Sequence, residues 1–309
     1  MTKSLVTGGA GFIGSHVVDK LLEMGHEVVC YDNESAESNE EFYWNPKAFN
    51  VKGDIRNYGL LKHCMDGVDY VFHLAAEARI QPAILNPIEA VSINCVGTVT
   101  VLQCAREAGV KKVIYSSTSS GYGFNEPPND ETQRDDCLNP YSVSKVSGEK
   151  LCSMYTDLFG LKTVIFRYFN VYGDRSPISG QYAPVIGIFL RQRRDNEPLT
   201  IVGDGEQRRD FTHVSDVVQA NILAATTEVD DECYGQLYNV GNGANYSINE
   251  IADAVSENQT NIPPRIGEAR TTLANNTKLK TTFGWEPKVN LEDGLIKTID
   301  WVEYKLTTE

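Results

Sequence analysis

A glycine-rich segment near the start of the chain limits its possible folds more than any other feature. Residues 7–14 read Thr-Gly-Gly-Ala-Gly-Phe-Ile-Gly and contain the pattern G-x-G-x-x-G, which ends at Gly14. A β-rich run, Ser4–Thr7, precedes the glycines, and an apolar helical pattern, Phe12–Met24, follows them. This context predicts a strand, a tight turn and a helix whose first N–H groups can bind a pyrophosphate.

An acidic residue at the end of the next predicted strand completes this pattern. Asp32 follows Gly14 by 18 residues, where a carboxylate accepts hydrogen bonds from an adenosine ribose and repels a 2′-phosphate. The sequence therefore favours NAD over NADP. The alternative is a glycine-rich turn without a ligand and a solvated Asp32, and the complete context favours the dinucleotide. Asp54, after the third strand, is either an adenine contact or a surface-turn residue.

Short β-rich runs and longer helical patterns alternate through the first half of the chain. Such alternation is typical of right-handed βαβ units and a parallel sheet. We therefore expect an α/β protein with a Rossmann-type doubly wound parallel sheet and a smaller mixed α/β C-terminal substrate domain. The further expected strands are Glu27–Tyr31, Ala48–Val51, Tyr70–Leu74, Lys112–Ser116 and Thr163–Phe166, and the further expected helices are Tyr58–Met65, Ile88–Ala108 and Tyr141–Phe159.

The character of the sequence changes after about Asn170. Glycine and proline become frequent and the secondary-structure patterns become shorter, although Ser247–Ser256 and Leu291–Lys305 retain helical patterns. We expect one domain over residues 1–169 and a second over 170–309. Some segments, such as the one around 211–240, are expected to return to the first domain.

Composition narrows the class of protein. The chain has 28 Lys and Arg against 42 Asp and Glu, a net charge of −14, which argues against nucleic acid and anionic membranes as partners. No apolar run approaches the roughly 18 residues that a membrane helix needs. The 7 cysteines are scattered and the 5 histidines show no ligand spacing, so we expect no metal site and a cytoplasmic location.

A tyrosine and a lysine lie one helical turn apart, at Tyr141 and Lys145. Because tyrosine titrates near 10, a phenolate at neutral pH needs about 4 kcal/mol of stabilisation. One cation ~6 Å away supplies about 2.8 kcal/mol at an effective dielectric constant of 20, so a second positive charge such as an oxidised nicotinamide is needed. Alone, this pair is a common surface pattern. The glycine-rich segment and the hydroxyl run 116–120 favour a catalytic pair instead.

Taken together, these motifs resemble those of the extended short-chain dehydrogenases/reductases, and specifically those of the UDP-hexose 4-epimerases. The resemblance extends over nearly the whole chain and implies an NAD-binding first domain and a nucleotide-sugar-binding second domain. Its marks are residues 7–14, Gly53-Asp54, His73-Leu74-Ala75-Ala76, Tyr141 with Lys145, Arg167 to Gly173, Gly203-Asp204-Gly205 and Arg209-Asp210-Phe211.

The resemblance assigns roles to individual residues. It implies that Thr118 bonds the sugar 4-hydroxyl, that Tyr141 is the catalytic base and that Lys145 is its electrostatic partner. Tyr141 and Lys145 also fall at cofactor-binding positions. The other residues at cofactor-binding positions are Gly8, Gly11, Phe12, Ile13, Gly14, Asp32, Asn33, Asp54, Ile55, Leu74, Ala75, Ala76, Asn94, Ser116 and Tyr168.

The same resemblance implies a nucleotide-sugar site that includes Thr118 and Tyr141. Its other residues are Asn170, Val185, Ile201, Arg209, Arg265, Glu268 and Thr272, with Arg209 at a diphosphate position. Thr272 falls at a gate position, where a bulky Tyr restricts the pocket to unmodified hexose and a small residue admits a 2-N-acetyl group. The alternative is a Thr without a substrate role. The family more often has Asp at position 268 and often has Lys at position 78.

The residues after Thr118 distinguish the reactions of related enzymes. Nucleotide-sugar dehydratases and decarboxylases resemble one another in carrying acidic residues there, whereas this chain has Ser119, Ser120 and Gly121. We therefore expect a UDP-glucose/UDP-galactose 4-epimerase, an isomerase that works through a 4-keto intermediate, with N-acetylated sugars as further substrates. The alternatives are an epimerase, reductase or dehydratase of GDP- or dTDP-sugars, or a catalytically silent NAD-binding sensor. The resemblance also implies a homodimer, paired through Ile88–Ala108 and Tyr141–Phe159.

Overall fold

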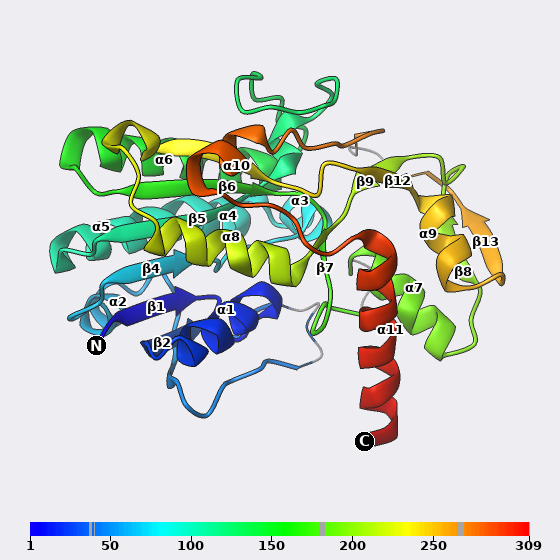
Figure 1. Cartoon of the computed structure of the whole chain (residues 1–309), viewed down its shortest axis with the longest axis horizontal. Helices are drawn as coiled ribbons and strands as arrows, with labels where there is room; N and C mark the ends of the chain where they lie inside the picture. Colours follow the sequence, from blue (N-terminus) through cyan, green and yellow to red (C-terminus); the bar gives the residue numbers. More distant parts are fainter. Residues whose placement is uncertain (37–38, 40, 179–182, 265–268, 309) are drawn as a thin grey trace.

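A seven-stranded parallel sheet forms the centre of the protein (Figure 1). The computed structural model describes residues 1–36, 39, 41–178, 183–264 and 269–308. The strand order is β11-β6-β5-β4-β1-β2-β3, and each neighbouring pair is parallel. The strands are β1 (Lys3–Thr7), β2 (Glu27–Asp32), β3 (Phe49–Lys52), β4 (Tyr70–His73), β5 (Lys112–Thr118), β6 (Thr163–Tyr168) and β11 (Gln236–Val240).

The direction of winding reverses at β1, which confirms the predicted doubly wound α/β fold. From β1 the chain adds β2 and β3 on one side, and then β4, β5 and β6 on the other. The loops that follow β1 and β4 therefore leave the sheet in opposite directions and open a crevice at the carboxyl ends of these strands. Ligands of open α/β sheets bind in such a crevice.

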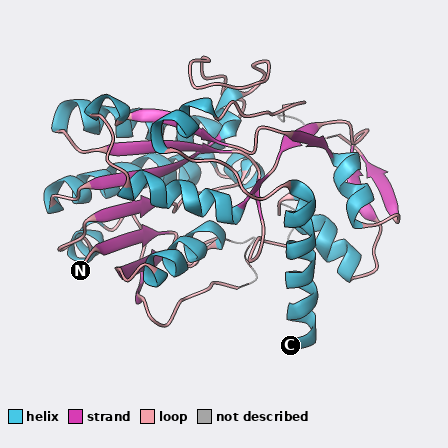
Figure 2. Cartoon of the chain, in the orientation of Figure 1, coloured by secondary structure: helices cyan, strands magenta, loops and turns pink. Residues whose placement is uncertain are grey.

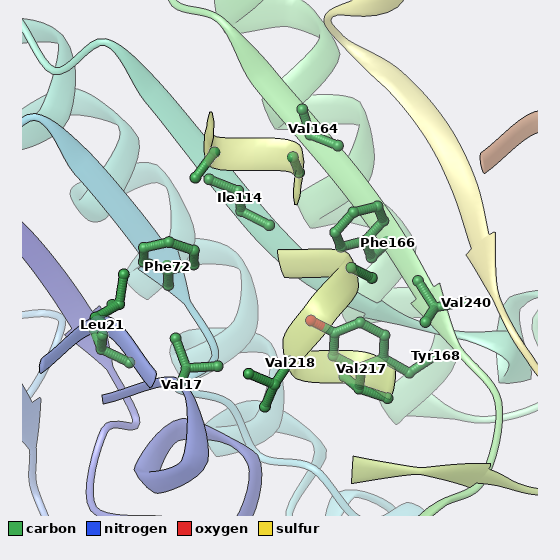
Figure 3. Packing of buried hydrophobic residues seen from close by; sticks show 14 of the residues in the cluster. Val17, Leu21, Phe72, Ile114, Val164, Phe166, Tyr168, Val217, Val218 and Val240 are labelled. Carbon is green, nitrogen blue, oxygen red and sulfur yellow. The ribbon is translucent and has the colours of Figure 1, made fainter. Parts of the chain in front are cut away.

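One face of the sheet is covered by α1 (Phe12–Glu23) and α8 (Val214–Thr226), with α10 (Thr277–Phe283) near β11. Figure 3 shows how the side chains of α1 and α8 converge on those of β4, β5 and β6. The continuous apolar strands of a parallel sheet need such cover because both faces are buried. The buried residues labelled there are Val17, Leu21, Phe72, Ile114, Val164, Phe166, Tyr168, Val217, Val218 and Val240.

The opposite face is covered by α2 (Tyr58–Cys64), α5 (Thr98–Ala108) and α6 (Pro140–Phe159). The predicted helix over 88–108 is present, but it contains a π-helical segment, η1 (Ser92–Gly97), between α4 (Pro87–Val91) and α5. A further helix, α3 (Ile80–Leu85), was missed by the sequence analysis, because Pro82 and Pro87 interrupt its helical pattern.

The helix from Pro87 to Ala108 is long and apolar enough to cross a membrane, with a mean hydropathy of 1.4 in its best window. The expectation that no apolar run approaches this length is therefore wrong for this segment. However, 44% of the window is buried inside the protein, where Val101, Leu102 and Ala105 pack against the sheet. The core helix of a soluble protein meets the same criterion, so the pattern does not establish a membrane span.

All six predicted strands are present, and each differs from its predicted bounds by one or two residues at an end, as β3 and β6 illustrate. β3 lies one residue later than predicted, and β6 continues to Tyr168 instead of ending at Phe166. Arg167 explains the second difference, because a charged residue is rare inside a buried strand. Its guanidinium is buried and bonds Glu149 of α6 at 2.7 Å, so the ion pair permits the strand to continue.

The second half of the chain adds a smaller layer at the carboxyl edge of the sheet (Figure 2). Its helices α7 (Val185–Arg194), α9 (Ile248–Val255) and α11 (Leu291–Thr308) share a separate hydrophobic cluster. Three short strand pairs join it: β8 (Leu199–Val202) with β13 (Gln259–Ile262), β9 (Arg208–Asp210) with β12 (Asn245–Ser247), and β7 (Val171–Tyr172) with β10 (Thr212–His213). The 3₁₀ turns are η2 (Ser119–Tyr122) and η3 (Asp231–Cys233).

The chain returns to the large sheet within this second half. Residues 214–226 form α8, which packs against α1, and residues 236–240 form β11, which pairs with β6. The domain boundary at residue 170 stays a prediction.

Gly14 provides a test of the packing between α1 and the glycine-rich loop. A Cβ at this position would lie 2.0 Å from the carbonyl oxygen of Gly8, which is backbone and cannot rotate away. We expect Gly14→Ala to lower the free energy of unfolding by on the order of 2 kcal/mol, as measured by chemical denaturation.

Gly59→Ala is the matched control, because a Cβ there meets only the Asn57 side chain, at 3.8 Å. Its stability should be unchanged or slightly higher, since alanine favours the helix. Equal stabilities of Gly14→Ala and the wild type would contradict the packing described here.

Candidate active site

The glycine-rich loop forms a cradle at the crevice. Gly8 has a φ of +69°, and its N–H donates to the Tyr31 carbonyl at 2.8 Å. The Gly11 N–H donates back to the Gly8 carbonyl at 3.2 Å, which makes the loop tight. Gly11 is the N-cap of α1, and the first helical turn has neither a side-chain cap nor an acidic residue. An anion at this point would therefore meet backbone N–H groups and the positive end of the helix.

Asp32 lies beside this cradle at the end of β2. Its carboxylate accepts hydrogen bonds from the Ala10 N–H at 3.1 Å and from the Glu34 N–H at 2.8 Å. The side chain is buried, and burial raises its pKa. The predicted ribose acid is thus held directly against the glycine-rich loop.

Asp54 and Asn33 lie together beyond Asp32. The Asn33 amide donates to the Asp54 carboxylate at 3.5 Å, and the Arg56 guanidinium donates to both Asp54 oxygens at 2.9 and 2.6 Å. These bonds from Arg56 lower the pKa of Asp54. Ile55 is buried between them and Gly97 of η1.

The loop after β4 closes the cradle from the other side. A Cβ on Gly8 would lie 2.7 Å from the Ala75 nitrogen, so the two loops touch through their backbones. The Ala75 N–H also donates to the Thr7 hydroxyl at 3.3 Å. Leu74, Ala75 and Ala76 are therefore adjacent to the glycine-rich loop, while Phe12 and Ile13 begin α1 on its far side.

Two predicted cofactor residues, Ser116 and Tyr168, are in hydrogen-bond contact. The Ser116 hydroxyl and the Tyr168 hydroxyl lie 2.9 Å apart, and the Asn221 amide donates to Tyr168 at 2.8 Å. Burial raises the pKa of Tyr168 to about 12, so this phenol remains neutral at physiological pH.

The structure brings Thr118 and Tyr141 together. Thr118 is the last residue of β5, and Tyr141 is in the first turn of α6. Asn139 and Ser142 form a capping box that starts the helix at this point, with the Ser142 N–H donating to the Asn139 side chain at 2.9 Å. The Thr118 hydroxyl is near enough to the Tyr141 phenol to lower its pKa, whereas burial raises this pKa and is the larger effect.

Lys145 is buried on the same helix, one turn after Tyr141. Its ammonium lies over the ring of Tyr115, 4.4 Å from the centroid, and the Tyr115 hydroxyl donates to the Lys145 carbonyl at 3.0 Å. Burial lowers the pKa of Lys145 to about 8. The sequence predicts Lys145 as the electrostatic partner of Tyr141, and this role stays a prediction. The charge of Arg79 also lowers the pKa of the Tyr141 phenol, whereas that of Glu77 raises it.

Arg79 is a site residue that the sequence analysis missed. It follows β4 in the same loop as Leu74–Ala76 and is the N-cap of α3. Its place shortly after a strand end was the available signal, because the carboxyl ends of parallel strands meet at one edge.

Asn94, a predicted cofactor residue, is hydrogen-bonded to two neighbouring parts of the chain. Its amide donates to the Glu77 carbonyl at 3.0 Å and to the Ser144 hydroxyl at 2.9 Å, and its oxygen accepts from the Glu77 N–H at 2.9 Å. These bonds connect the loop after β4 to α6 from the π-helical segment, a conformation that is frequent at functional sites.

On the substrate side, Asn170 and Thr272 are neighbours. The Asn170 amide donates to the Asp210 carbonyl at 2.9 Å and lies 3.5 Å from the Thr272 hydroxyl, and Asn170 has a φ of +23°. The fully buried Asp210 carboxylate accepts N–H bonds from Asn242, Gly243 and Ala274 at 2.8 to 3.0 Å. Burial raises its pKa to about 6.

The remaining predicted substrate residues are more widely placed. The Arg209 guanidinium donates to the carbonyls of Arg208 and Arg270 at 3.0 and 3.2 Å. Val185 begins α7 and packs against the cluster of the smaller layer, in which Ile201 of β8 is buried. Arg265 and Glu268 lie outside the described residues.

Metal-ligand chemistry has little support in the described part of the chain, where no group of three or more His, Cys, Asp or Glu side chains could hold an ion. A dinucleotide fits better. One edge of the sheet carries all the groups that a dinucleotide would contact. They are the uncapped glycine cradle, the adjacent Asp32, the Thr118 hydroxyl, the Tyr141 phenol and the Lys145 amine.

Comparisons with known proteins agree with this site. Residues 4–241 match the profile described as the NAD dependent epimerase/dehydratase family. A putative UDP-glucose 4-epimerase of Methanocaldococcus jannaschii is 35% identical, over 97% of this chain and 98% of its own. A UDP-N-acetyl-alpha-D-glucosaminuronate decarboxylase of Bacillus cytotoxicus is also 35% identical, over 97% of each chain.

Solved structures show the same likeness. The crystal structure of UDP-glucose 4-epimerase with UDP-glucose from Thermotoga maritima has a TM-score of 0.92 and 35% identity, with 100% of both chains covered. These findings confirm the predicted family resemblance and the predicted cofactor. The chain therefore belongs to the NAD dependent epimerase/dehydratase family, and its cofactor is NAD.

Proposed function

We propose that this protein is a UDP-hexose 4-epimerase that interconverts UDP-glucose and UDP-galactose and also accepts their N-acetylated forms. The observation that carries the proposal is the placement of Thr118, at the end of β5, beside Tyr141, in the first turn of α6, where Thr118 lowers the pKa of the phenol. A hydroxyl and a phenol at this place can remove the proton from a sugar hydroxyl. The similarity to UDP-glucose 4-epimerases supports the same reaction.

The roles of the residues follow from their chemistry. Thr118 bonds the 4-hydroxyl of the sugar and Tyr141, as phenolate, takes its proton. Bound NAD supplies the chemistry of accepting the C4 hydride and returning it. The 4-keto sugar turns about its diphosphate link, and Tyr141 returns the proton when the opposite face of C4 is reduced. Lys145 is the electrostatic partner of the phenol and bonds the nicotinamide ribose.

The turn after Thr118 supports epimerisation over elimination. Ser119, Ser120 and Gly121 form η2 and carry no carboxylate. Expulsion of a sugar hydroxyl as water needs a general acid at the leaving group, and decarboxylases of this family also resemble dehydratases in having an acid here. The decarboxylase similarity is therefore a similarity of fold and cofactor, and product identification separates the two reactions.

The nucleotide is held, in this proposal, by the second half of the chain. Asn170 and Arg209 contact the UDP portion, with Arg209 on the diphosphate, and Val185, Ile201, Arg265, Glu268 and Thr272 complete the site. The contact between Asn170 and Thr272 supports a shared role at the sugar end. We assign residues 1–169 to NAD binding and 170–309 to the nucleotide sugar, in a cytoplasmic enzyme.

We further propose a homodimer. Apolar side chains are exposed on adjacent helices of one side of the sheet: Leu85 of α3 is 73% exposed, Ile88 of α4 is 83% exposed and Val143 of α6 is 49% exposed. Water-exposed side chains of this size on packed neighbouring helices are typical of an interface. This surface supports pairing through the helices over 87–108 and 140–159.

The reaction is tested with purified protein and UDP-galactose or UDP-N-acetylgalactosamine, without added reductant. We expect the 4-epimer as the product, identified by chromatography and NMR. Tyr141→Phe should retain NAD while turnover falls by at least about a thousandfold, since the proton acceptor is lost.

Tyr122→Phe is the control for this substitution, because it also removes one buried phenol hydroxyl, which donates to the Asn239 side chain and has no role in the proposed reaction. A lack of interconversion of any UDP-sugar would defeat the proposal, and activity on a GDP- or dTDP-sugar alone would support the alternative nucleotide. Release of carbon dioxide from a UDP-hexuronate would assign the protein to the decarboxylases instead.

Thr272 is tested as a gate of the sugar pocket. Its hydroxyl lies beside Asn170, and Thr272→Tyr would place a ring at the sugar end. We expect kcat/KM for UDP-N-acetylgalactosamine to fall at least about tenfold while that for UDP-galactose changes little, since only the larger sugar is excluded. Thr272→Ser is the matched control and should keep both activities. An equal loss for both sugars would remove the gate role.

Asp32 is tested as the residue that recognises the adenosine ribose. Loss of its charged hydrogen bonds in Asp32→Ser should weaken NAD binding about ten- to a hundredfold, as measured by calorimetry on protein stripped of cofactor. The preference for NAD over NADP should decrease as well, because the repulsion of a 2′-phosphate is lost. An unchanged preference would mean that another group selects the dinucleotide.

A further inference from the structure

Arg79 lies in the candidate active site but has no role in the proposed function. It lies in the loop after β4, at the carboxyl edge of the sheet, with extended backbone dihedrals of φ −126° and ψ 139°. The helix that it caps, α3, packs against α6, the helix that carries Tyr141. The two side chains are near enough for the charge of Arg79 to lower the pKa of the Tyr141 phenol.

Hydrogen bonds fix the loop of Arg79 relative to α6. The Arg79 N–H donates to the Glu77 carboxylate at 3.1 Å. The backbone of Glu77 is in turn held on both its N–H and its carbonyl by the Asn94 side chain, which also donates to the Ser144 hydroxyl. Ser144 directly precedes Lys145, so these hydrogen bonds fix the position of the loop relative to α6.

The side chain of Arg79 has unused hydrogen-bonding capacity at this place. Its Nε is buried and has no hydrogen-bond partner among the described residues. A buried guanidinium nitrogen without an acceptor is uncommon in folded proteins and needs an explanation. An anion that forms only during turnover would be the acceptor that this nitrogen lacks in the protein alone.

We propose that Arg79 is a positioning residue of the active site that stabilises the phenolate of Tyr141 and so permits proton abstraction at neutral pH. This inference rests on the proposed function. Arg79 supplies a second positive charge from the protein itself. One cation ~6 Å from the phenol, as expected for Lys145, does not stabilise the phenolate enough for it to form at neutral pH.

Besides Lys145, the other titratable groups around Tyr141 do not supply a positive charge. Glu77, in the same loop, disfavours the phenolate. Tyr115 of β5 adds a neutral phenol, and its own pKa is raised well above the usual value by burial. Lys145 of α6 faces the Tyr115 ring.

The two cations also differ in how they respond to pH. Burial lowers the pKa of Lys145 to about 8, so its charge is lost over the range in which a base becomes more active. Burial also lowers the pKa of Arg79, but a guanidinium stays protonated in proteins over that range. Arginine at position 79 therefore provides a positive charge that persists when Lys145 is neutral.

The test is the pH dependence of kcat/KM for UDP-galactose with the NAD-loaded enzyme. Removal of a cation raises the pKa of the phenol, so less phenolate is present at a given pH. In Arg79→Gln the acid limb should move up by about one to two pH units, with about a tenfold or greater loss at pH 7 that is recovered at higher pH. Arg79→Lys should restore most of the acid limb.

Arg106→Gln, on the exposed side of α5, is the control for loss of one arginine and should leave the profile unchanged. An equal loss at every pH in Arg79→Gln would overturn the proposal in favour of a purely structural role. A higher KM confined to UDP-glucuronate, with an unmoved acid limb, would overturn it in favour of binding a substrate carboxylate.

A second measurement separates this inference from the proposed function. The near-ultraviolet absorbance of tyrosinate is titrated in the wild type and in Tyr141→Phe, and the difference reports the ionisation of Tyr141 without any substrate. Arg79→Gln should move this midpoint upward even if the enzyme acts on another sugar. An unmoved midpoint would overturn the role of Arg79, whereas an inactive wild type with a moved midpoint would defeat only the proposed reaction.

Discussion

Contact between backbones at the carboxyl edge of the sheet is the constraint on which the site depends. Gly8 lies against the backbone of Ala75, and Gly14 lies against that of Gly8, at distances that leave no space for a Cβ. Because of these contacts, α1 can begin immediately after β1, and the loop after β4 can lie across the end of the same strand. The cofactor cradle and the loop that carries Arg79 are consequences of this one close approach.

The position of α6 on the sheet is also fixed by close contacts. A Cβ on Gly148 would lie 2.1 Å from the Tyr115 hydroxyl, which itself bonds the Lys145 carbonyl. This contact fixes the height of α6 on the sheet, while the capping box at Asn139 fixes where the helix begins. Together they bring Tyr141 to the end of β5, where Thr118 is. The relative position of Thr118 and Tyr141, on which the proposed proton transfer depends, is therefore set by packing around other residues.

The second half of the chain is organised around a buried acid. Asp210 accepts N–H bonds from two loops, and its own carbonyl accepts from Asn170. These loops come from distant parts of the sequence, so the carboxylate acts as a joint that holds them together. Three backbone N–H donors offset the free-energy cost of burying its charge. Thr272 is held at the same joint, next to Asn170. The proposed sugar end of the site thus has a rigid base.

The sequence by itself determined the doubly wound fold and the cofactor, because both depend on local patterns: glycine spacing and strand–helix alternation. Other features depend on contacts between residues far apart in the chain, which no local pattern records. Examples are the position of Lys145 over Tyr115, the bonds by which Asn94 holds Glu77, the bond of Arg79 to Glu77 and the joint at Asp210. Tertiary structure decided them, since burial and charge at one residue are set by neighbours that only the folded chain brings together.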